Sequence, residues 1–273
     1  MALPPAAPST GLRAAPWQVV TAGAAVGLLG GMIGLGGAEF RLPLLIGLFG
    51  FLALQAVILN KAMSLLVVLT ALPARLAGVP LSSLTPEWPV VLNLLAGSLV
   101  GAYAGASWAT RMRTSTLYRV LAGMLVLIAV ALYASHAGTV QPLDLPDSAQ
   151  VPVGVVAGFF IGVVAAVMGV AGGELLIPTI VLLYAVDIKT AGSLSLVVSL
   201  PTMLVAFARY SRDGSFDVLR NNRRFVPLMA SGSAVGTVLG GLAVGVVPDS
   251  VLLPLLTAVL LISARKVWGH RYV

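Results

Sequence analysis

The stretch GMIGLGGAEFRLPLL, residues 31–45, lies inside a long apolar run, yet it contains four glycines, a glutamate, an arginine and a proline. Charges and interrupted backbone are costly in a segment that faces lipid, because no water is present to satisfy them. A related stretch, AAVMGVAGGELLIPT, occupies residues 165–179. The same kind of interruption therefore occurs twice along the chain.

The composition predicts an all-α polytopic membrane protein. The chain has 273 residues, of which 59% are hydrophobic and 9% are charged, and its mean hydropathy is +1.03. A soluble domain carries about 25% charged residues. Apolar runs of about 17–25 residues, long enough to cross a bilayer, recur along the chain.

The same composition argues against several other classes of protein. The net charge of +7 comes from basic residues at the ends of apolar runs, where the positive-inside rule expects them, so we predict no nucleic-acid partner. No cysteine is present, and the two histidines stand apart. We therefore predict no metal, no cofactor and no enzymatic activity, because no nucleophile with a base and no ligand cluster is in view.

Apolar runs and the residues that break them predict ten segments. Two of these, 41–52 and 175–186, have about 12 residues, or roughly 18 Å of helix, which is too short to cross as a straight helix. Both follow the glycine-rich interruptions. The predicted segments are 17–34, 41–52, 54–77, 88–110, 117–135, 151–169, 175–186, 189–209, 224–246 and 250–267.

The two halves of the chain are copies of one another. Residues 23–71 align without a gap with residues 158–206, at an offset of 135. A glutamate and a proline that recur in the same glycine context are the most informative matches, and they indicate an internal duplication. The matching pairs include Gly34/Gly169, Gly37/Gly172, Glu39/Glu174, Pro43/Pro178 and Ser64/Ser199.

The distribution of Lys and Arg predicts that the copies are inverted. Arginines gather in 111–119, 209–224 and the C-terminal end, whereas 78–87, 136–150 and 247–249 contain acids and no Lys or Arg. With the basic loops in the cytoplasm, both termini lie inside and each copy has an odd number of crossings.

We predict two inverted repeats of about five segments each, with a broken or short helix in each. The alternative left open is that the short segments re-enter instead of spanning. The predicted parts are a disordered tail 1–16, repeat one 17–135, an extracytoplasmic linker 136–150, repeat two 151–268 and a cytoplasmic tail 269–273.

Inverted copies place both interrupted stretches near the bilayer midplane, where the free N–H groups of a helix start favour an anion. The glycines permit close backbone approach there. We therefore expect the substrate to meet the backbone at Gly36, Gly37, Gly172 and Gly173.

Glu39 and Glu174 lie at these predicted helix starts. Each is either a proton-coupling or gating group or a structural cap. Arg41, which has Leu176 as its counterpart, either contacts the anion directly or pairs with a glutamate.

Polar residues on the next long segments are candidates for the lining of a cavity. Asn60 and Ser64, and their counterparts Ser195 and Ser199, are spaced by four and so share a helix face. The alternative is that these side chains only hold helices together, as is common in membranes. Lys61 is either a ligand or an end residue that extends to the interface.

These stretches resemble the TauE/SafE family of sulfite-exporter-like membrane permeases. The resemblance lies in GLLGGMIGLGGAEFRLPLL and GVVAAVMGVAGGELLIPTI, with NKAMSLLVV and AGSLSLVVS after them. It implies a bacterial or archaeal inner-membrane protein that moves sulfite, thiosulfate, sulfoacetate or other organosulfonates. The family motif falls on Gly34, Gly36, Gly37, Pro43, Gly169, Gly172, Gly173 and Pro178, and Ala38 and Ala171 depart from it.

We therefore expect a secondary transporter of a small sulfur-containing anion that alternates access around a midplane site. Its partners are the anion and the lipid bilayer, with protons as coupling ion and a homo-oligomer left open. The rival interpretations are a transporter of another small organic anion, such as a carboxylate, and an anion channel.

Overall fold

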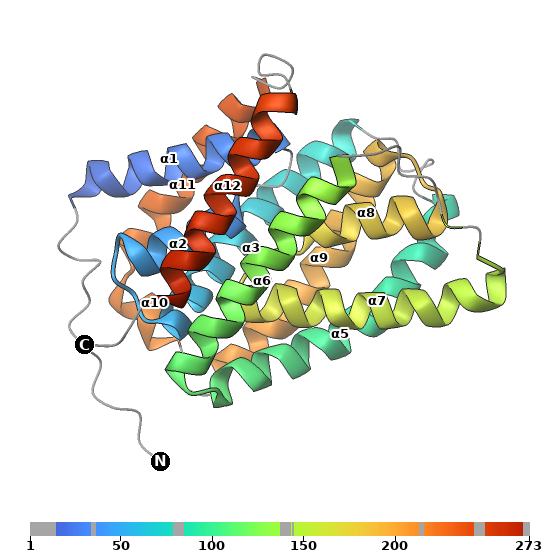
Figure 1. The fold of residues 1–273 in the computed structure, drawn as a ribbon, viewed down its shortest axis with the longest axis horizontal. Coiled ribbons are helices and arrows are strands. Elements are labelled where there is room, and N and C mark those ends of the chain that lie inside the picture. Colours follow the sequence, from blue (N-terminus) through green and yellow to red (C-terminus); the bar gives the residue numbers. More distant parts are fainter. Residues whose placement is uncertain are drawn as a thin grey trace.

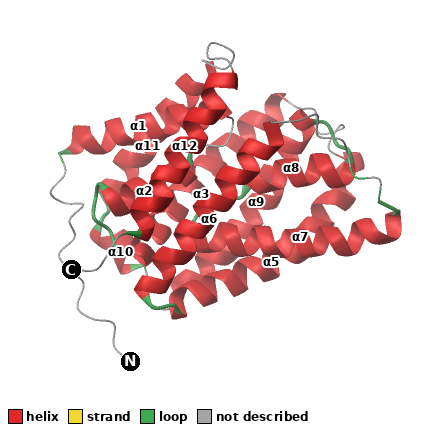
Figure 2. Ribbon diagram, in the orientation of Figure 1, coloured by secondary structure: helices red, strands yellow, loops and turns green. Residues whose placement is uncertain are grey.

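The computed structural model describes residues 15–33, 37–78, 85–136, 143, 145–212, 216–242 and 249–269, and within these ranges the chain is helical with short turns and no strand (Figure 2). Most of the predicted tails and linker, together with Gly34 and Gly36, lies outside the described residues. The elements are α1 (Pro16–Ile33), α2 (Ala38–Gly47), α3 (Ala53–Gly78), the short turn η2 (Thr85–Glu87), α5 (Trp88–Arg111), α6 (Thr114–His136), α7 (Asp147–Met168), α8 (Gly173–Tyr184), α9 (Ile188–Ser211), α10 (Asp217–Asn221), α11 (Phe225–Leu242) and α12 (Asp249–Trp268).

All helices except η2 and α10 overlap the ten predicted segments, which confirms an all-α polytopic membrane protein. The largest difference is at α2, which begins three residues and ends five residues before the predicted segment 41–52. Within the described ranges four helices are long and apolar enough to cross a membrane: Thr85–Arg111, Thr114–Ala131, Ser148–Met168 and Thr190–Ser211. By contrast α2 has 10 residues and α8 has 12. The two short helices therefore need long neighbours beside them to cover their ends.

Each short helix begins at a glycine in the left-handed conformation. The φ angle is 72° at Gly37, before α2, and 88° at Gly172, before α8. Helix α7 ends in the same way at Gly169, with φ 72°. Side chains with a Cβ atom rarely adopt this conformation, so these glycines separate the long helices from the short ones.

The predicted segments 41–52 and 175–186 have a proline close to each start, but the structure places both prolines deeper. Because α2 begins at Ala38 and α8 at Gly173, Pro43 and Pro178 fall in the second turn rather than at the helix starts. Each proline lacks the N–H group that would bond to the carbonyl four residues earlier. Those carbonyls belong to Glu39 and Glu174.

Glycines bring helices from the two halves into close parallel pairs. On α1, Gly23 faces Met229 of α11 and Gly31 faces Thr237, and a Cβ atom at either glycine would overlap the partner backbone. The numbering rises on both helices together, so the two helices are parallel. Small residues permit this close approach between membrane helices.

Helices α5 and α7 pair in the same manner. Gly97 lies against Val155 and Gly105 against Val163, so these helices are parallel as well. The resulting pairs are α1 with α11 and α5 with α7. Each pair takes one helix from the first half of the chain and one from the second.

The side-chain contacts also give the direction of α8 and α9. Ser98 of α5 lies 2.8 Å from Thr202 of α9, and Arg209 Nε donates to Ser107 Oγ at 2.7 Å, so α9 is parallel to α5. Gln150 Nε2 at the start of α7 donates to the carbonyl of Leu183 at the end of α8, at 3.0 Å. Helix α8 therefore runs back toward the side on which α7 begins.

Figure 1 shows how the first helices of the two halves are oriented. Helix α1 begins at the left of the view and runs to the right, whereas α7 begins at the right and runs to the left. Helix α1 and α7, which we predict to be its counterpart, thus run in opposite directions in this view.

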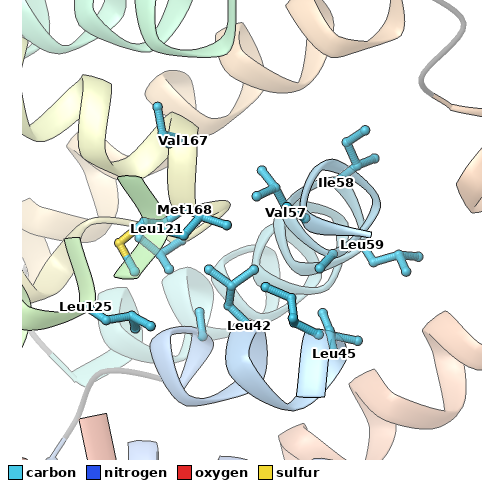
Figure 3. Packing of buried hydrophobic residues seen from close by; sticks show 14 of the residues in the cluster. Leu42, Leu45, Val57, Ile58, Leu59, Leu121, Leu125, Val167 and Met168 are labelled. Carbon is cyan, nitrogen blue, oxygen red and sulfur yellow. The ribbon is translucent and has the colours of Figure 1, made fainter. Parts of the chain in front are cut away.

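The short helix α2 lies at the centre of the main buried cluster. Leu42 and Leu45 of α2 are both 0% exposed, and Figure 3 shows them together with side chains of α3, α6 and the end of α7. The neighbouring residues labelled there include Val57, Leu59, Leu121, Leu125 and Met168. This packing holds the start of α2 close to the end of α7.

The glycine at the start of α2 gives a test of this arrangement. We expect Gly37→Ala to lower the melting temperature of the purified protein, because the left-handed conformation costs roughly 1–2 kcal/mol for a residue with a Cβ atom and that atom would overlap the carbonyl of Val26. Gly123→Ala is the matched control, since no atom lies within 4 Å of its added Cβ. Equal melting temperatures for the two variants would contradict the arrangement.

Candidate functional site

Four ionisable side chains gather where α2 and α8 begin, α7 ends and α3 passes between them. Glu39, Arg41 and Lys61 are almost completely buried, at 1%, 0% and 0% exposure, and Glu174 is partly exposed. Such residues inside membrane segments are costly and usually functional. We call these four residues the charge cluster.

The two glutamates, one from each half of the chain, lie close enough for their carboxyl groups to interact. Each occupies the second position of its short helix, where the N-terminal end of the helix favours a negative charge. No hydrogen-bond partner among the described residues is present for either carboxyl oxygen of Glu39 or for Oε2 of Glu174. Three carboxyl oxygens of this pair therefore lack a donor among the described residues.

Arg41 is fully buried and only weakly bonded. Its Nη1 atom lies 3.4 Å from Oδ1 of Asn60 and 3.5 Å from Oγ of Ser64, at the long end of hydrogen-bond geometry. Nε and Nη2 have no hydrogen-bond partner within the described ranges. Since Glu39 is two residues away on the helix, the two side chains leave α2 on different faces.

Asn60 connects the two interrupted stretches. Its Nδ2 atom donates to the carbonyl of Ala38, at 3.0 Å, and to the carbonyl of Met168, at 3.2 Å. Ala38 opens α2 and Met168 closes α7. One amide group from α3 thus satisfies backbone at both breaks, while its oxygen accepts from Arg41.

Lys61 is not an interfacial residue. Its Nζ atom donates to the carbonyls of Ala165, at 2.7 Å, and Val170, at 2.9 Å. Ala165 lies in the last turn of α7 and Val170 in the turn that follows it, and Glu174 lies within electrostatic range of the amine. Of the two alternatives for Lys61, a residue that extends to the interface does not agree with this complete burial.

The whole chain was also compared with known proteins. It matches the family described as sulfite exporter TauE/SafE over residues 1–132 and 146–271. The chain belongs to this family. No curated protein and no solved structure gave a significant match. The TauE/SafE family consists of membrane transporters for sulfur-containing anions, so a transporter function follows from this membership.

In this TauE/SafE member the predicted site residues fall into two groups. Arg41, Asn60, Ser64, Glu39 and Glu174 meet in or beside the charge cluster. Gly37 and Gly172 precede the short helices, and Gly173 is the first residue of α8. Gly36 lies outside the described residues.

Two of the predicted serines are buried but are not tied to Arg41. The Ser195 hydroxyl donates to the carbonyl of Gly192 in its own helix, at 2.8 Å. Ser199 Oγ has no hydrogen-bond partner in the described part of the chain. Their role in the site stays a prediction.

Sequence reasoning missed two polar contacts near the TauE/SafE site. Tyr210, at 0% exposure, donates to the carbonyl of Ala166 at the end of α7, at 3.0 Å. Ser98 and Thr202 bond to each other between α5 and α9. A tyrosine near the end of an apolar run is ordinary in membrane proteins, so no local signal marks Tyr210.

The bonds of Asn60 give a second test. We expect Asn60→Ala to lower stability markedly, because two buried carbonyls lose their donor and an unsatisfied buried group costs roughly 1–3 kcal/mol. Ser195→Ala is the matched control, since Ser195 is the counterpart of Asn60 in the second half and bonds only within its own helix. Melting temperatures in detergent measure the difference, and a larger loss for the serine variant would contradict the linking role.

Proposed function

We propose that this protein is a secondary transporter of small sulfur-containing anions such as sulfite, thiosulfate, sulfoacetate or other organosulfonates, with the charge cluster as its substrate site. The observation that carries this proposal is the buried, weakly bonded guanidinium of Arg41. Membership of the TauE/SafE family supports the substrate class.

A guanidinium group suits an anion that presents several oxygen atoms. It has five N–H donors in one plane and forms paired, charge-assisted hydrogen bonds to oxyanions. Nε and Nη2 of Arg41 have no hydrogen-bond partner among the residues that the structure describes, and these two nitrogens offer donors to an anion. Ser64 and Asn60 beside Nη1 supply further polar groups.

The balance of charge favours coupling of the anion to a proton. Arg41 and Lys61 carry two positive charges, and Glu39 and Glu174 carry two negative ones when ionised, so the cluster is formally neutral. An anion that enters alone leaves a net negative charge in a buried site, which is costly. A proton taken up by the neighbouring carboxyl groups restores neutrality, and we assign this role to Glu39 and Glu174.

Alternating access follows from the architecture that we propose, in which two inverted repeats rock around a midplane site. The opposite directions of α1 and α7 (Figure 1) support this proposal. So do the matching breaks at Gly37 and Gly172, both in the left-handed conformation.

We place the protein in a bacterial or archaeal inner membrane with both termini in the cytoplasm. In support, Arg111 ends α5 and Arg209 lies near the end of α9, and the parallel course of these helices brings both basic ends to the same side. The positive-inside rule makes that side cytoplasmic.

Flux in proteoliposomes tests the proposed function. Purified protein would be reconstituted with radiolabelled sulfite on one side, and saturable flux that an organosulfonate inhibits is the expected result. Flux that a carboxylate of similar size inhibits equally well would point to a carrier of other organic anions. Flux that does not saturate would point to a channel, and absence of any flux would contradict the assignment.

Arg41→Ala should raise the apparent KM for sulfite roughly tenfold or more, because a charge-assisted hydrogen bond contributes about 1.5–3 kcal/mol. Arg41→Lys keeps the charge but loses the paired geometry, so an intermediate KM is expected. Arg111→Ala, at the exposed end of α5, is the control. A KM of wild-type value for Arg41→Ala would make this residue structural.

Glu39→Gln and Glu174→Gln should uncouple proton movement from the anion, because a neutral amide cannot exchange a proton. The measurement is internal pH in the same vesicles while a sulfite gradient is imposed. The wild type should show a pH change that follows the anion, and each variant should reduce it at least severalfold. Glu87→Gln, in turn η2, should leave it unchanged, and an unaltered pH change in both site variants would remove the coupling role.

A further inference from the structure

We propose that the Lys61 ammonium is a tethered cation that occupies an ion site at the end of α7, so that this transporter works without sodium. The proposal deepens the transport function proposed above, because it assigns the site that a coupling cation would otherwise use. It also predicts that removal of the side chain opens a site for Na⁺.

The end of α7 has the features of a cation site. The last carbonyls of a helix are free of intrahelical partners and carry its negative dipole end. In transporters with interrupted helices, such carbonyls and helix ends coordinate Na⁺ or protons. Here the left-handed turn at Gly169 reverses the chain, and the Ala165 carbonyl accepts from the N–H groups of Gly169 and Val170. The reversal also brings the carbonyls of Ala165 and Val170 to one side-chain donor, Nζ of Lys61.

Lys61 fills that point. Its Nζ atom lies 2.7 Å from the carbonyl of Ala165 and 2.9 Å from that of Val170, and the side chain is 0% exposed. An ammonium group has three donors. Two of these donors bond to the carbonyls, and Glu174 lies within electrostatic range. The amine is therefore bound to the interrupted backbone at the end of α7 and not to the substrate.

Two other carbonyls of this break accept from neutral side chains. Ala166 accepts from Tyr210, and Met168 accepts from Asn60. The carbonyls of Ala165 and Val170 instead accept from the charged Lys61 ammonium. A single positive charge surrounded by backbone carbonyls and a carboxyl group is the environment that a bound Na⁺ ion would have.

The two halves differ at this position. The counterpart of Lys61 in the second half is Leu196, so the copied helix brings no amine to the other break. A lysine needed only to join helices would serve equally well in both copies. The positive charge is thus present at only one of the two breaks, as expected for a single coupling cation.

The melting temperature of purified variants tests the proposal without any transport assay. Lys61→Ala should melt below the wild type in N-methyl-D-glucamine chloride, and NaCl at equal ionic strength should raise its melting temperature by a few degrees in a saturable manner. Lys61→Met, which keeps most of the volume without the charge, should not respond to Na⁺. The wild type should melt at the same temperature in both salts.

Each contrary result overturns the proposal. Lys61→Ala with no preference for Na⁺ would show that no ion site is opened, and an equal response of Lys61→Met would show a general salt effect. If Lys61→Ala cannot be purified folded, wild-type sulfite flux with NaCl replaced by N-methyl-D-glucamine chloride decides, since dependence on Na⁺ contradicts a built-in cation. Absence of sulfite flux in both salts would contradict the proposed transport function, whereas the melting temperatures would still test the ion site.

Discussion

The interrupted backbone inside the membrane is the constraint on which the rest of this structure depends. Two short helices start in the middle of the protein, and the carbonyls that end α7 there cannot be left without partners in a low-dielectric interior. Side chains from neighbouring helices supply the partners: Asn60 and Lys61 from α3 and Tyr210 from α9. The polar groups of the site are therefore part of the fold before they serve any substrate.

The same side chains link stability to the transport that we propose. Asn60 bonds to both breaks and to Arg41, so a movement of either short helix alters the surroundings of the guanidinium. The two glutamates approach each other from α2 and α8, so a relative movement of these helices changes their separation. In the proposed mechanism, the uptake of an anion, the uptake of a proton and the movement therefore involve one group of contacts.

The sequence predicts the helices well because membrane spans are read from length and polarity. The two breaks are also predictable, since a glutamate and a proline in a glycine-rich context recur at a fixed offset. The role of Lys61 was not predictable, because its carbonyl partners lie more than a hundred positions away in the chain. Tyr210 and the Ser98–Thr202 contact depend in the same way on which helices become neighbours.

The serines show where periodicity alone is insufficient. Ser64 and Ser199 occupy matched positions in the two halves, and Ser64 lies beside Arg41. The residue that matches Arg41 in the second half is Leu176, so Ser199 has no equivalent arginine beside it. Equivalent positions therefore meet different neighbours. The predicted repeat leads us to expect two similar backbones, and the residues that differ between matched positions decide which half carries the arginine.

The glycine-lined pairs have a consequence for how the molecule is divided. Because α1 packs on α11 and α5 packs on α7, each tight helix pair contains one member from either side of residues 136–150. Close helix packing therefore joins the two halves of the sequence instead of separating them. A chain cut between α6 and α7 would yield two fragments that each lack the partner of their own first helix, so the two fragments would have to assemble together.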